Sequence, residues 1–362
     1  MVPYFKSNNG ILYYGDAAEL PTRVKANSVH CVVTSPPYWG KVDYMEGEPD
    51  QLGLDKTPQQ YVDRLVSIFK GIRKILHPSG TVWLNIQDTN CVPSTKREGE
   101  LGMKPGVPAK NRIGIPWKVA FALQADGWWL RSDNVWWKVN GNREPVRDRP
   151  TYEHEYVFLL TKKAHYFYDQ VAVYQPLKSG DRYAGDRRKI TTESGGMFHG
   201  GHNRKAKLSG KNLGSVWNIP TQGRTDSHYA AFPDKLVSRC IKAGTSLKGC
   251  CSVCYAPLKR VTERINEDCA PETVGWEPTC GCNATIVPCT VLDPFMGRGT
   301  TALVAESLMK NWIGSEKSDE FCELIKQNLI NRKVGLLPTT APQNGLFKLT
   351  ETDIEIKAQR SK

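Results

Sequence analysis

The sequence predicts an α/β protein with a doubly wound, Rossmann-like fold around a largely parallel sheet. Apolar runs of strand length alternate with segments whose apolar residues recur at helical spacing, and this alternation is typical of such sheets. A turn that contains Gly297 and Gly299 follows one strand and opens a helix, as nucleotide-binding turns do. The 362 residues allow one large domain with insertions.

The first expected strand covers residues 29–33 and ends at Thr34-Ser-Pro-Pro-Tyr38, because two prolines cannot continue a central strand. Residues 61–76 place their apolar side chains on one helical face, and His77-Pro-Ser-Gly80 ends that helix. The other expected strands are residues 81–86, 133–139, 155–160, 286–292 and 312–316, and the other expected helices are residues 117–125, 235–243 and 302–309.

Composition excludes several classes of protein. No apolar stretch approaches the roughly 20 residues of a membrane span, and the first ten residues lack the charged and apolar regions of a secretory signal. We therefore expect a cytoplasmic protein without a membrane partner. The net charge of +12 favours an acidic partner, of which nucleic acid is the commonest. Residues 178–211 contain nine Lys or Arg and three Asp or Glu, which marks a basic insertion.

Six of the eleven cysteines fall between Cys250 and Cys282. Cysteines in a cytoplasmic chain bind metal more often than they form disulfide frameworks. Two close pairs predict a structural zinc site with four thiolate ligands, and reduced thiols without metal are the alternative. The expected ligands are Cys251, Cys254, Cys280 and Cys282, with Cys250 as a substitute for Cys251.

The segment Asp293-Pro-Phe-Met-Gly-Arg-Gly-Thr-Thr301 predicts a cofactor turn. Its glycines let the backbone approach a ligand closely, and Thr300 or Thr301 is expected to cap the following helix. Glu316 ends the next strand and is placed to accept hydrogen bonds from both ribose hydroxyls of an adenosine-containing cofactor. The turn lacks a P-loop lysine and a third glycine, so S-adenosylmethionine fits better than a dinucleotide.

The tetrapeptide Ser35-Pro-Pro-Tyr38 predicts a rigid loop with outward carbonyl groups. Acceptors at Ser35 and at the Pro36 carbonyl suit both N–H groups of an aromatic amine, and they favour its nucleophilic geometry. Such an amine lies inside a DNA duplex, so the base must be flipped out, and Tyr38 is expected to stack on it. A proline-rich turn without a ligand is the alternative reading of the segment alone.

With these motifs in this order, the chain resembles the DNA amino-methyltransferases, specifically the permuted group in which the catalytic tetrapeptide precedes the cofactor loop. The similarity covers roughly residues 13–330 and includes Gly15-Asp16, where the family's Asp contacts the adenine. It also includes Phe232-Pro-Asp-Lys-Leu236, which resembles the family's segment that packs against the methionine part of the cofactor. It implies a circularly permuted S-adenosylmethionine-dependent methyltransferase fold. It also implies an enzyme that methylates specific sites in double-stranded DNA. The implied catalytic residues are Ser35, Pro36, Pro37 and Tyr38. The implied cofactor-binding residues are Asp16, Phe232, Pro233, Asp293, Phe295, Gly297, Gly299, Thr300, Thr301 and Glu316.

Two features bear on the finer function. Arg298 stands where the family usually has a small residue such as Ser. Ser as the first letter of the tetrapeptide is the form mostly found in N4-cytosine enzymes, whereas N6-adenine enzymes usually have Asp or Asn. The resemblance therefore favours cytosine N4, with adenine N6 as the alternative. A catalytically silent zinc-containing DNA-binding protein and a dehydrogenase, the latter supported by the glycine turn alone, are the competing classes.

The basic insertion lies where the resembled group has its target recognition region. We expect its side chains to contact DNA phosphates and bases; a solvated loop is the alternative. A cognate restriction endonuclease and the oligomeric state are left open. The expected DNA-binding residues are Arg182, Arg187, Arg188, Lys189, Arg204 and Lys205. The expected organisation is a first catalytic part (residues 1–168), the target recognition insertion (169–217), a cofactor-packing segment (218–245), the zinc-binding insertion (246–285), the cofactor-binding part (286–335) and a polar tail (336–362).

Overall fold

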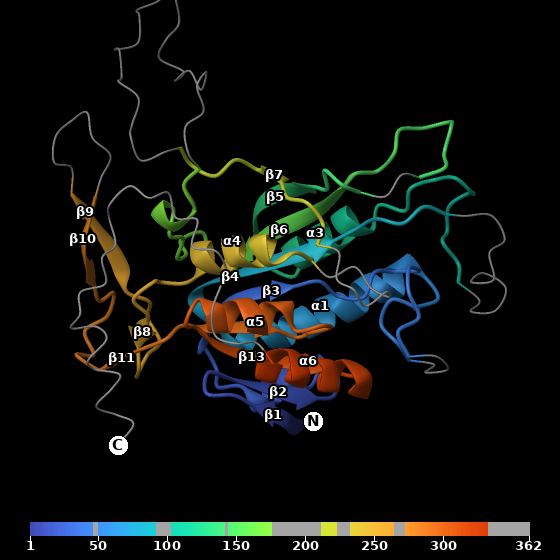
Figure 1. Cartoon of the computed structure of the whole chain (residues 1–362). Helices are drawn as coiled ribbons and strands as arrows, with labels where there is room; N and C mark the ends of the chain where they lie inside the picture. Colours follow the sequence, from blue (N-terminus) through green and yellow to red (C-terminus); the bar gives the residue numbers. More distant parts are fainter. Residues whose placement is uncertain are drawn as a thin grey trace, which may run out of the picture. The chain divides into compact units, whose positions relative to one another are not determined.

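A mixed sheet of nine strands organises the described part of the chain (Figure 1). The computed structural model describes residues 1–45, 50–91, 103–141, 144–175, 211–222, 232–263 and 272–331. In spatial order the strands are β1 (Val2–Lys6), β2 (Gly10–Tyr14), β13 (Asn311–Glu316), β12 (Thr290–Asp293), β3 (Val29–Thr34), β4 (Leu76–Ile86), β6 (His154–Thr161), β5 (Trp129–Trp137) and β7 (Val216–Asn218).

The expectation of a largely parallel sheet is right for its centre. Strands β2, β13, β12, β3 and β4 run parallel. β6, however, is antiparallel to both β4 and β5, and β1 is antiparallel to β2. No helix separates β5 from β6 in the described chain, and without a crossover helix neighbouring strands pair antiparallel. The β1–β2 hairpin was not expected from the sequence.

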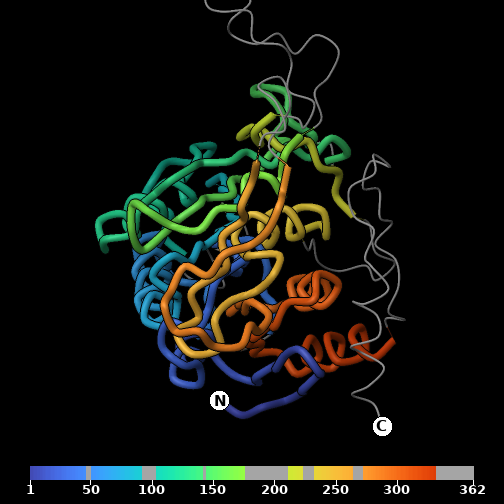
Figure 2. The backbone as a smooth tube through the Cα atoms, turned by 90° about the vertical axis from the view of Figure 1, so that its left-hand side faces the viewer, coloured from blue at the N-terminus to red at the C-terminus, as the bar shows by residue number. Residues whose placement is uncertain are grey.

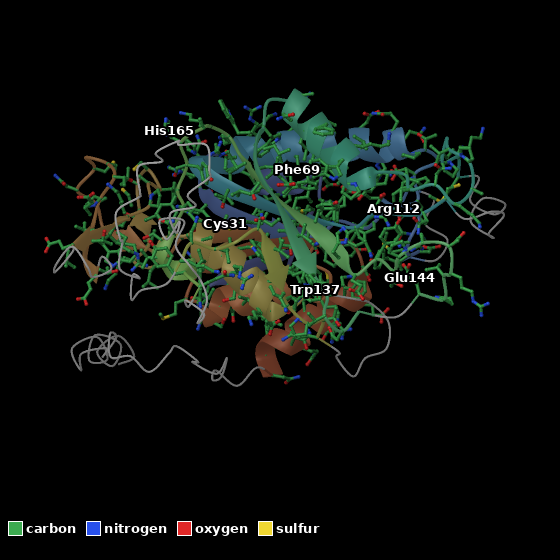
Figure 3. All side chains as sticks on the ribbon, turned by 90° about the horizontal axis from the view of Figure 1, so that it is seen from above. Cys31, Phe69, Arg112, Trp137, Glu144 and His165 are labelled. Carbon is green, nitrogen blue, oxygen red and sulfur yellow. The ribbon has the colours of Figure 1, made fainter. Side chains whose placement is uncertain are left out.

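Helices cover both faces of the sheet. The helices are α1 (Pro58–Ile75), α3 (Ile115–Ala125), α4 (Asp234–Gly244), α5 (Thr300–Ser307) and α6 (Asp319–Asn331), with short 3-10 turns η1 (Leu20–Arg23) and η2 (Val171–Val173). One buried cluster joins α1 and α3 to the sheet, and a second joins α4, α5 and α6 to its opposite face. Phe69 and Cys31 represent the two clusters and both lie within the molecule (Figure 3). α1 begins three residues earlier than predicted because Thr57 and Gln60 form a capping box.

The cysteine-rich insertion forms two small antiparallel sheets outside the main one. β8 (Cys250–Cys251) pairs with β11 (Ile286–Val287), and β9 (Lys259–Glu263) pairs with β10 (Glu272–Glu277). Figure 2 shows the insertion in front of the main sheet. The strand predicted for residues 286–292 is thus divided: β11 belongs to the insertion and β12 to the main sheet. Pro288 lies at the division, where proline has no N–H for a ladder.

Met1–Ile330 packs as one unit. The predicted tail at residues 336–362 lies outside the described residues. Among the helices of the described ranges, none has the length and apolar character needed to cross a membrane.

Candidate active site

The two predicted motifs meet at the carboxyl ends of β3 and β12, which are adjacent parallel strands. The Thr34 hydroxyl donates to Asp293 Oδ1 at 2.7 Å, although the two residues are 259 positions apart in the chain. Between the loops that follow these strands lies a pocket of about 180 Å³. Open α/β sheets bind ligands at such a place, outside the carboxyl ends of their strands.

Most of the predicted catalytic and cofactor-binding residues border this pocket. Those in its lining are Asp16, Ser35, Pro36, Pro37, Tyr38, Phe232, Phe295, Gly297, Thr300 and Glu316. Four others, Pro233, Asp293, Gly299 and Thr301, are not in its lining. The lining also contains an aromatic pair that sequence reasoning missed: the rings of Tyr44 and Phe321 meet edge to face, with centroids 6.4 Å apart.

Glu316 presents a carboxylate that is fixed by backbone groups. Its Oε2 accepts from the N–H of Gly297 at 2.8 Å, and its Oε1 accepts from the N–H groups of Lys317 at 2.9 Å and Ser318 at 3.0 Å. Burial raises the pKa of this carboxyl, while the three N–H donors oppose the rise. Each oxygen of an ionised carboxylate has more than one acceptor site, so Glu316 can also hold hydroxyl groups of a ligand in the pocket.

Asp293 has a different environment from Glu316. It is 1% exposed. Its oxygens accept from the Thr34 hydroxyl, from the Phe295 N–H at 3.0 Å and from the Thr301 hydroxyl at 2.7 Å. Burial raises its pKa to about 7. The side chain therefore ties β3, the glycine turn and α5 together.

The glycine turn matches its prediction in the glycines and departs from it in the helix cap. Gly297 and Gly299 have φ angles of 51° and 82°, in the left-handed region that favours glycine. Gly299 is itself the N-cap residue, and no side chain caps α5. The prediction that Thr300 or Thr301 caps this helix is therefore wrong, because the Thr301 hydroxyl is committed to Asp293. Arg298, between the glycines, is 7% exposed and borders the pocket.

Hydrogen bonds with Tyr61 and Glu155 hold the tetrapeptide in place. The Pro37 carbonyl accepts from the Tyr61 hydroxyl at 2.8 Å. Ser35 Oγ donates to the Tyr38 hydroxyl at 3.0 Å, and Tyr38 in turn donates to Glu155 Oε2 at 2.7 Å. Within the described ranges no residue donates to the Pro36 carbonyl, so it is available to a ligand. Burial, followed by the nearby charge of Glu155, raises the pKa of the Tyr38 hydroxyl well above its ordinary value.

Sequence reasoning missed Glu155 and its ion-pair partner Lys138. Glu155 is 4% exposed and lies in β6, among apolar residues. Lys138 follows Trp137 at the end of β5. A charged residue at the end of an apolar strand was the available signal, since such groups are rarely buried unless paired.

Asp16 Oδ1 accepts from the Ala18 N–H at 2.8 Å and fixes the turn after β2. This contact orients the carboxyl at the pocket wall. It suits the predicted contact with adenine, which stays a prediction.

The predicted zinc ligands come together. The sulfur atoms of Cys251, Cys254, Cys280 and Cys282 all lie within 4.8 Å of one another. Backbone N–H groups of Cys254 and Val253 lower the pKa of the Cys251 thiol to about 6, which favours the thiolate that metals bind. The substitute ligand considered from the sequence, Cys250, is directed elsewhere, since its sulfur lies with Cys289 and His30. The donor set therefore fits a tetrahedral zinc ion.

The six predicted DNA-binding residues, Arg182, Arg187, Arg188, Lys189, Arg204 and Lys205, lie outside the described residues. The structure instead shows cations that the sequence did not single out. The guanidinium groups of Arg112 and Arg149 lie 3.6 and 4.3 Å from the ring centroid of Tyr152. Figure 3 places Arg112 and Glu144 toward the same end of the molecule and His165 at the other. Arg149 pairs with Glu144 at 2.6 Å.

The fold and the pocket define a doubly wound α/β protein whose tetrapeptide and cofactor loop border a single cavity. Residues 29–251 and 284–327 match the DNA methylase family, and the chain belongs to this family. The prediction of a DNA amino-methyltransferase family member is confirmed.

Relatives of known class cover nearly the whole chain. Type II methyltransferase M.SmaI of Serratia marcescens is 33% identical over 88% of this chain and 90% of its own length. Type II methyltransferase M.Cfr9I of Citrobacter freundii is 33% identical over 89% of this chain and 88% of its own length. Among solved structures, the cytosine-N4-specific PvuII DNA methyltransferase covers 92% of this chain and 91% of its own, with a TM-score of 0.56 and 18% identity. That likeness shows the fold.

Proposed function

We propose that this protein transfers a methyl group from S-adenosylmethionine to the N4 amine of a flipped cytosine in double-stranded DNA. The observation that carries the proposal is the single pocket bordered both by the acceptors of Ser35 and Pro36 and by the Glu316 carboxylate. One set suits an amine and the other suits ribose hydroxyls. Family membership supports DNA as the substrate.

S-adenosylmethionine supplies an electrophilic methyl group when it is bound. Glu316 would accept from the ribose hydroxyls and Asp16 from the adenine, while Phe232 and Phe295 line the pocket and supply apolar surface. Ser35 and the Pro36 carbonyl would accept from the amine N–H groups and turn the nitrogen lone pair toward the methyl carbon. Tyr38 would stack on the flipped base.

The amine is itself the nucleophile in this reaction, so no cysteine has to attack the base. The environment of Cys31 supports this, because burial raises its pKa to about 12 and its side chain is fully enclosed. A folded Cys31→Ala variant should keep methyl transfer. Loss of transfer in that variant would argue for a covalent mechanism.

The choice of cytosine rests on Ser35 as the first residue of the tetrapeptide, and the cytosine-N4-specific structural neighbour is consistent with it. Adenine N6 is the alternative. The test is to methylate DNA with labelled cofactor, digest it to nucleosides and identify the labelled product by mass. N4-methylcytosine supports the proposal, and N6-methyladenine selects the alternative. DNA binding without any transfer would indicate a silent DNA-binding protein.

We further propose that the four clustered cysteines hold a structural zinc ion, that the chain is circularly permuted as the resembled group is, and that the basic insertion recognises the target sequence. The Type II class of the relatives supports site-specific action and a cognate restriction endonuclease as functional partner. Sequencing the modified positions in DNA from cells that express the protein would give the recognition site.

A further inference from the structure

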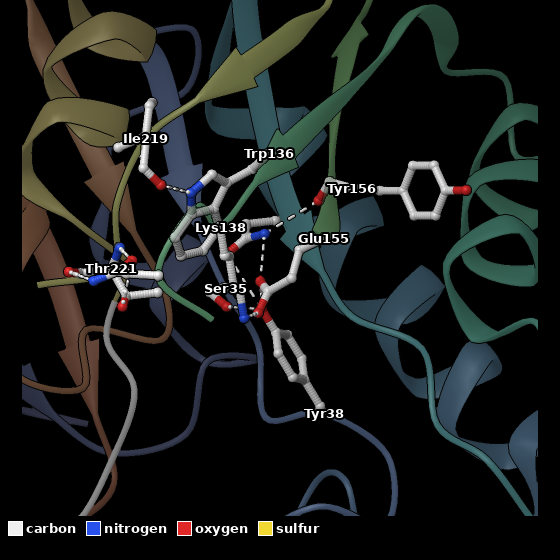
Figure 4. Close-up of polar contacts among 10 residues, drawn as sticks. Ser35, Tyr38, Trp136, Lys138, Glu155, Tyr156, Ile219 and Thr221 are labelled. Atoms are coloured by element: carbon white, nitrogen blue, oxygen red, sulfur yellow. Dashed lines mark hydrogen bonds and ion pairs between the residues drawn. The ribbon is translucent and has the colours of Figure 1, made fainter. Parts of the chain in front are cut away.

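A buried carboxylate lies directly behind the tetrapeptide. Glu155 Oε2 accepts from the Tyr38 hydroxyl at 2.7 Å (Figure 4). It also accepts from Asn85 Nδ2 at 2.8 Å. Its other oxygen, Oε1, pairs with Lys138 Nζ. The carboxylate therefore receives three donors, which come from the loop after β3 (Tyr38), from β4 (Asn85) and from the residue that follows β5 (Lys138).

These contacts fix the direction of a chain of hydrogen bonds. An ionised carboxylate accepts and cannot donate, so the single proton of the Tyr38 hydroxyl points to Glu155. Asn85 Oδ1 is a weaker alternative acceptor at 3.2 Å. The Tyr38 oxygen can then only accept from Ser35, and the Ser35 proton points to Tyr38. The Ser35 oxygen is left with its lone pairs for the pocket.

We propose that Glu155 is a positioning residue that makes Ser35 an acceptor toward the substrate amine. The inference rests on the proposed function. An amine that donates to Ser35 keeps its lone pair for the methyl carbon. A Ser35 hydroxyl that donated to the amine instead would occupy that lone pair and block attack. Glu155 acts through Tyr38 and need not touch the base.

The surroundings of Glu155 oppose any reversal of this polarity. Asn85 Nδ2 also donates to the Tyr156 carbonyl at 3.1 Å, which fixes the orientation of its amide. Lys138 Nζ lies 5.0 Å from the ring centroid of Trp136. The Trp136 indole in turn donates to the Ile219 carbonyl at 2.8 Å. The Lys138 ammonium and the Asn85 NH2 group can only donate, so these two partners keep Glu155 as an acceptor.

The test is a double-mutant cycle on single-turnover methyl transfer. Glu155→Gln keeps the shape but offers Tyr38 an N–H donor, and Tyr38→Phe keeps the ring but removes the hydroxyl. Each should slow transfer by about tenfold to a hundredfold, the range for a hydrogen bond to a charged group. The double variant should be no slower than the slower single variant, because both changes break one chain. Cofactor affinity should not change.

Glu153→Gln is the matched control, since it removes the same charge at an exposed position two residues earlier. It should transfer at the wild-type rate. Wild-type rates in Glu155→Gln, or losses that multiply in the double variant, would overturn the inference.

If Glu155→Gln does not fold, as its melting curve would show, Tyr38→Phe carries the test, and a wild-type rate in that variant overturns the inference. A wild-type protein that methylates no DNA would instead refute the proposed function.

Discussion

Asp293 and Glu316 each end one of two adjacent parallel strands, β12 and β13, but their surroundings indicate different roles. Glu316 keeps acceptor capacity at the pocket, whereas the oxygens of Asp293 accept from Thr34, Phe295 and Thr301. The sequence predicted the same role for both acids. The difference depends on hydroxyl groups that only the folded chain brings to Asp293, and no local pattern contains that information.

Glu316→Ala should weaken S-adenosylmethionine binding by roughly tenfold to a hundredfold, because hydrogen bonds to a charged acceptor are lost. Titration calorimetry would measure the affinity. Glu320→Ala, at an exposed position on α6, is the control and should bind as the wild type does. Unchanged cofactor affinity in Glu316→Ala, together with weakened DNA binding, would reverse our assignment of the two ends of the site.

Asp293→Asn should change how stability depends on pH. Burial raises the pKa of Asp293 from 3.8 to about 7 in the folded protein. Between these values the folded state holds a proton that the unfolded chain releases, so the wild type loses stability as pH rises through this window and stays level above it. Asparagine carries no such proton. The free energy of unfolding of the variant should therefore rise relative to that of the wild type as pH rises through this window, by at most about 4 kcal/mol.

Urea unfolding of the ligand-free proteins at several pH values would measure this difference. Asp63→Asn, an exposed change on α1, is the control, and its stability should depend on pH as that of the wild type does. A constant gap between Asp293→Asn and the wild type from acid to neutral pH would contradict the assigned ionisation.

At the scale of elements, the cysteine-rich insertion was predicted by residue spacing and not by its strands. Two pairs at close spacing indicated the cluster, and the structure brings the four sulfurs together. Strands β8 and β11 have two residues each, which is too short for any periodicity to be visible. The site was thus more predictable than the element that carries it.

Removing zinc should lower thermal stability, because structural zinc contributes directly to folding. Metal analysis of protein purified under reducing conditions should find about one zinc per chain. Cys254→Ser should lose the metal, whereas Cys322→Ser, in α6 and outside the cluster, should keep it. Protein that contains no metal under these conditions would refute the site.

Neutralising Arg187, Arg188 and Lys189 together should flatten the salt dependence of DNA binding, since each phosphate contact contributes counterion release. The control changes three exposed helical lysines, Lys74, Lys118 and Lys242, to the same neutral residue. Binding measured over a series of salt concentrations gives both slopes. Equal slopes for the two triple variants would show that the basic insertion does not contribute to the salt dependence of DNA binding.

At the scale of the whole molecule, the sequence predicted the alternation of strands and helices but not all of its topology. Local patterns located β3, α4, α5 and β13 within two residues, whereas β4 begins at Leu76, five residues before its predicted start. Pairing direction and the β1–β2 edge depend on how distant strands meet. Glu155 shows the same limit for the site, because its partners come from three other segments of the chain.

A buried ion pair couples the cysteine-rich insertion to the rest of the fold. Arg260 on β9 donates to Asp169 Oδ1 at 2.9 Å and to Oδ2 at 2.6 Å, and it also donates to Thr273 Oγ1 on β10 at 2.8 Å. Asp169 is 5% exposed and lies two residues before the start of η2. Arg260→Met would leave this carboxylate buried without its cation, at a cost of about 3 to 5 kcal/mol. Lys259→Met breaks only an exposed pair with Glu277 and should cost about 0.5 kcal/mol or less.

Through the Arg260–Asp169 pair, loss of zinc should also destabilise the catalytic part of the protein. Stripping zinc from the wild type should loosen β9 and β10, disturb Arg260 and weaken the hold on Asp169, which bonds through its own N–H to the Ala243 carbonyl at the end of α4. In the double variant Asp169→Asn/Arg260→Met this route is absent. The chelator should therefore lower the unfolding temperature of the cofactor-bound protein less in the double variant than in the wild type. Equal decreases in both proteins would show that the insertion stabilises the fold through other contacts.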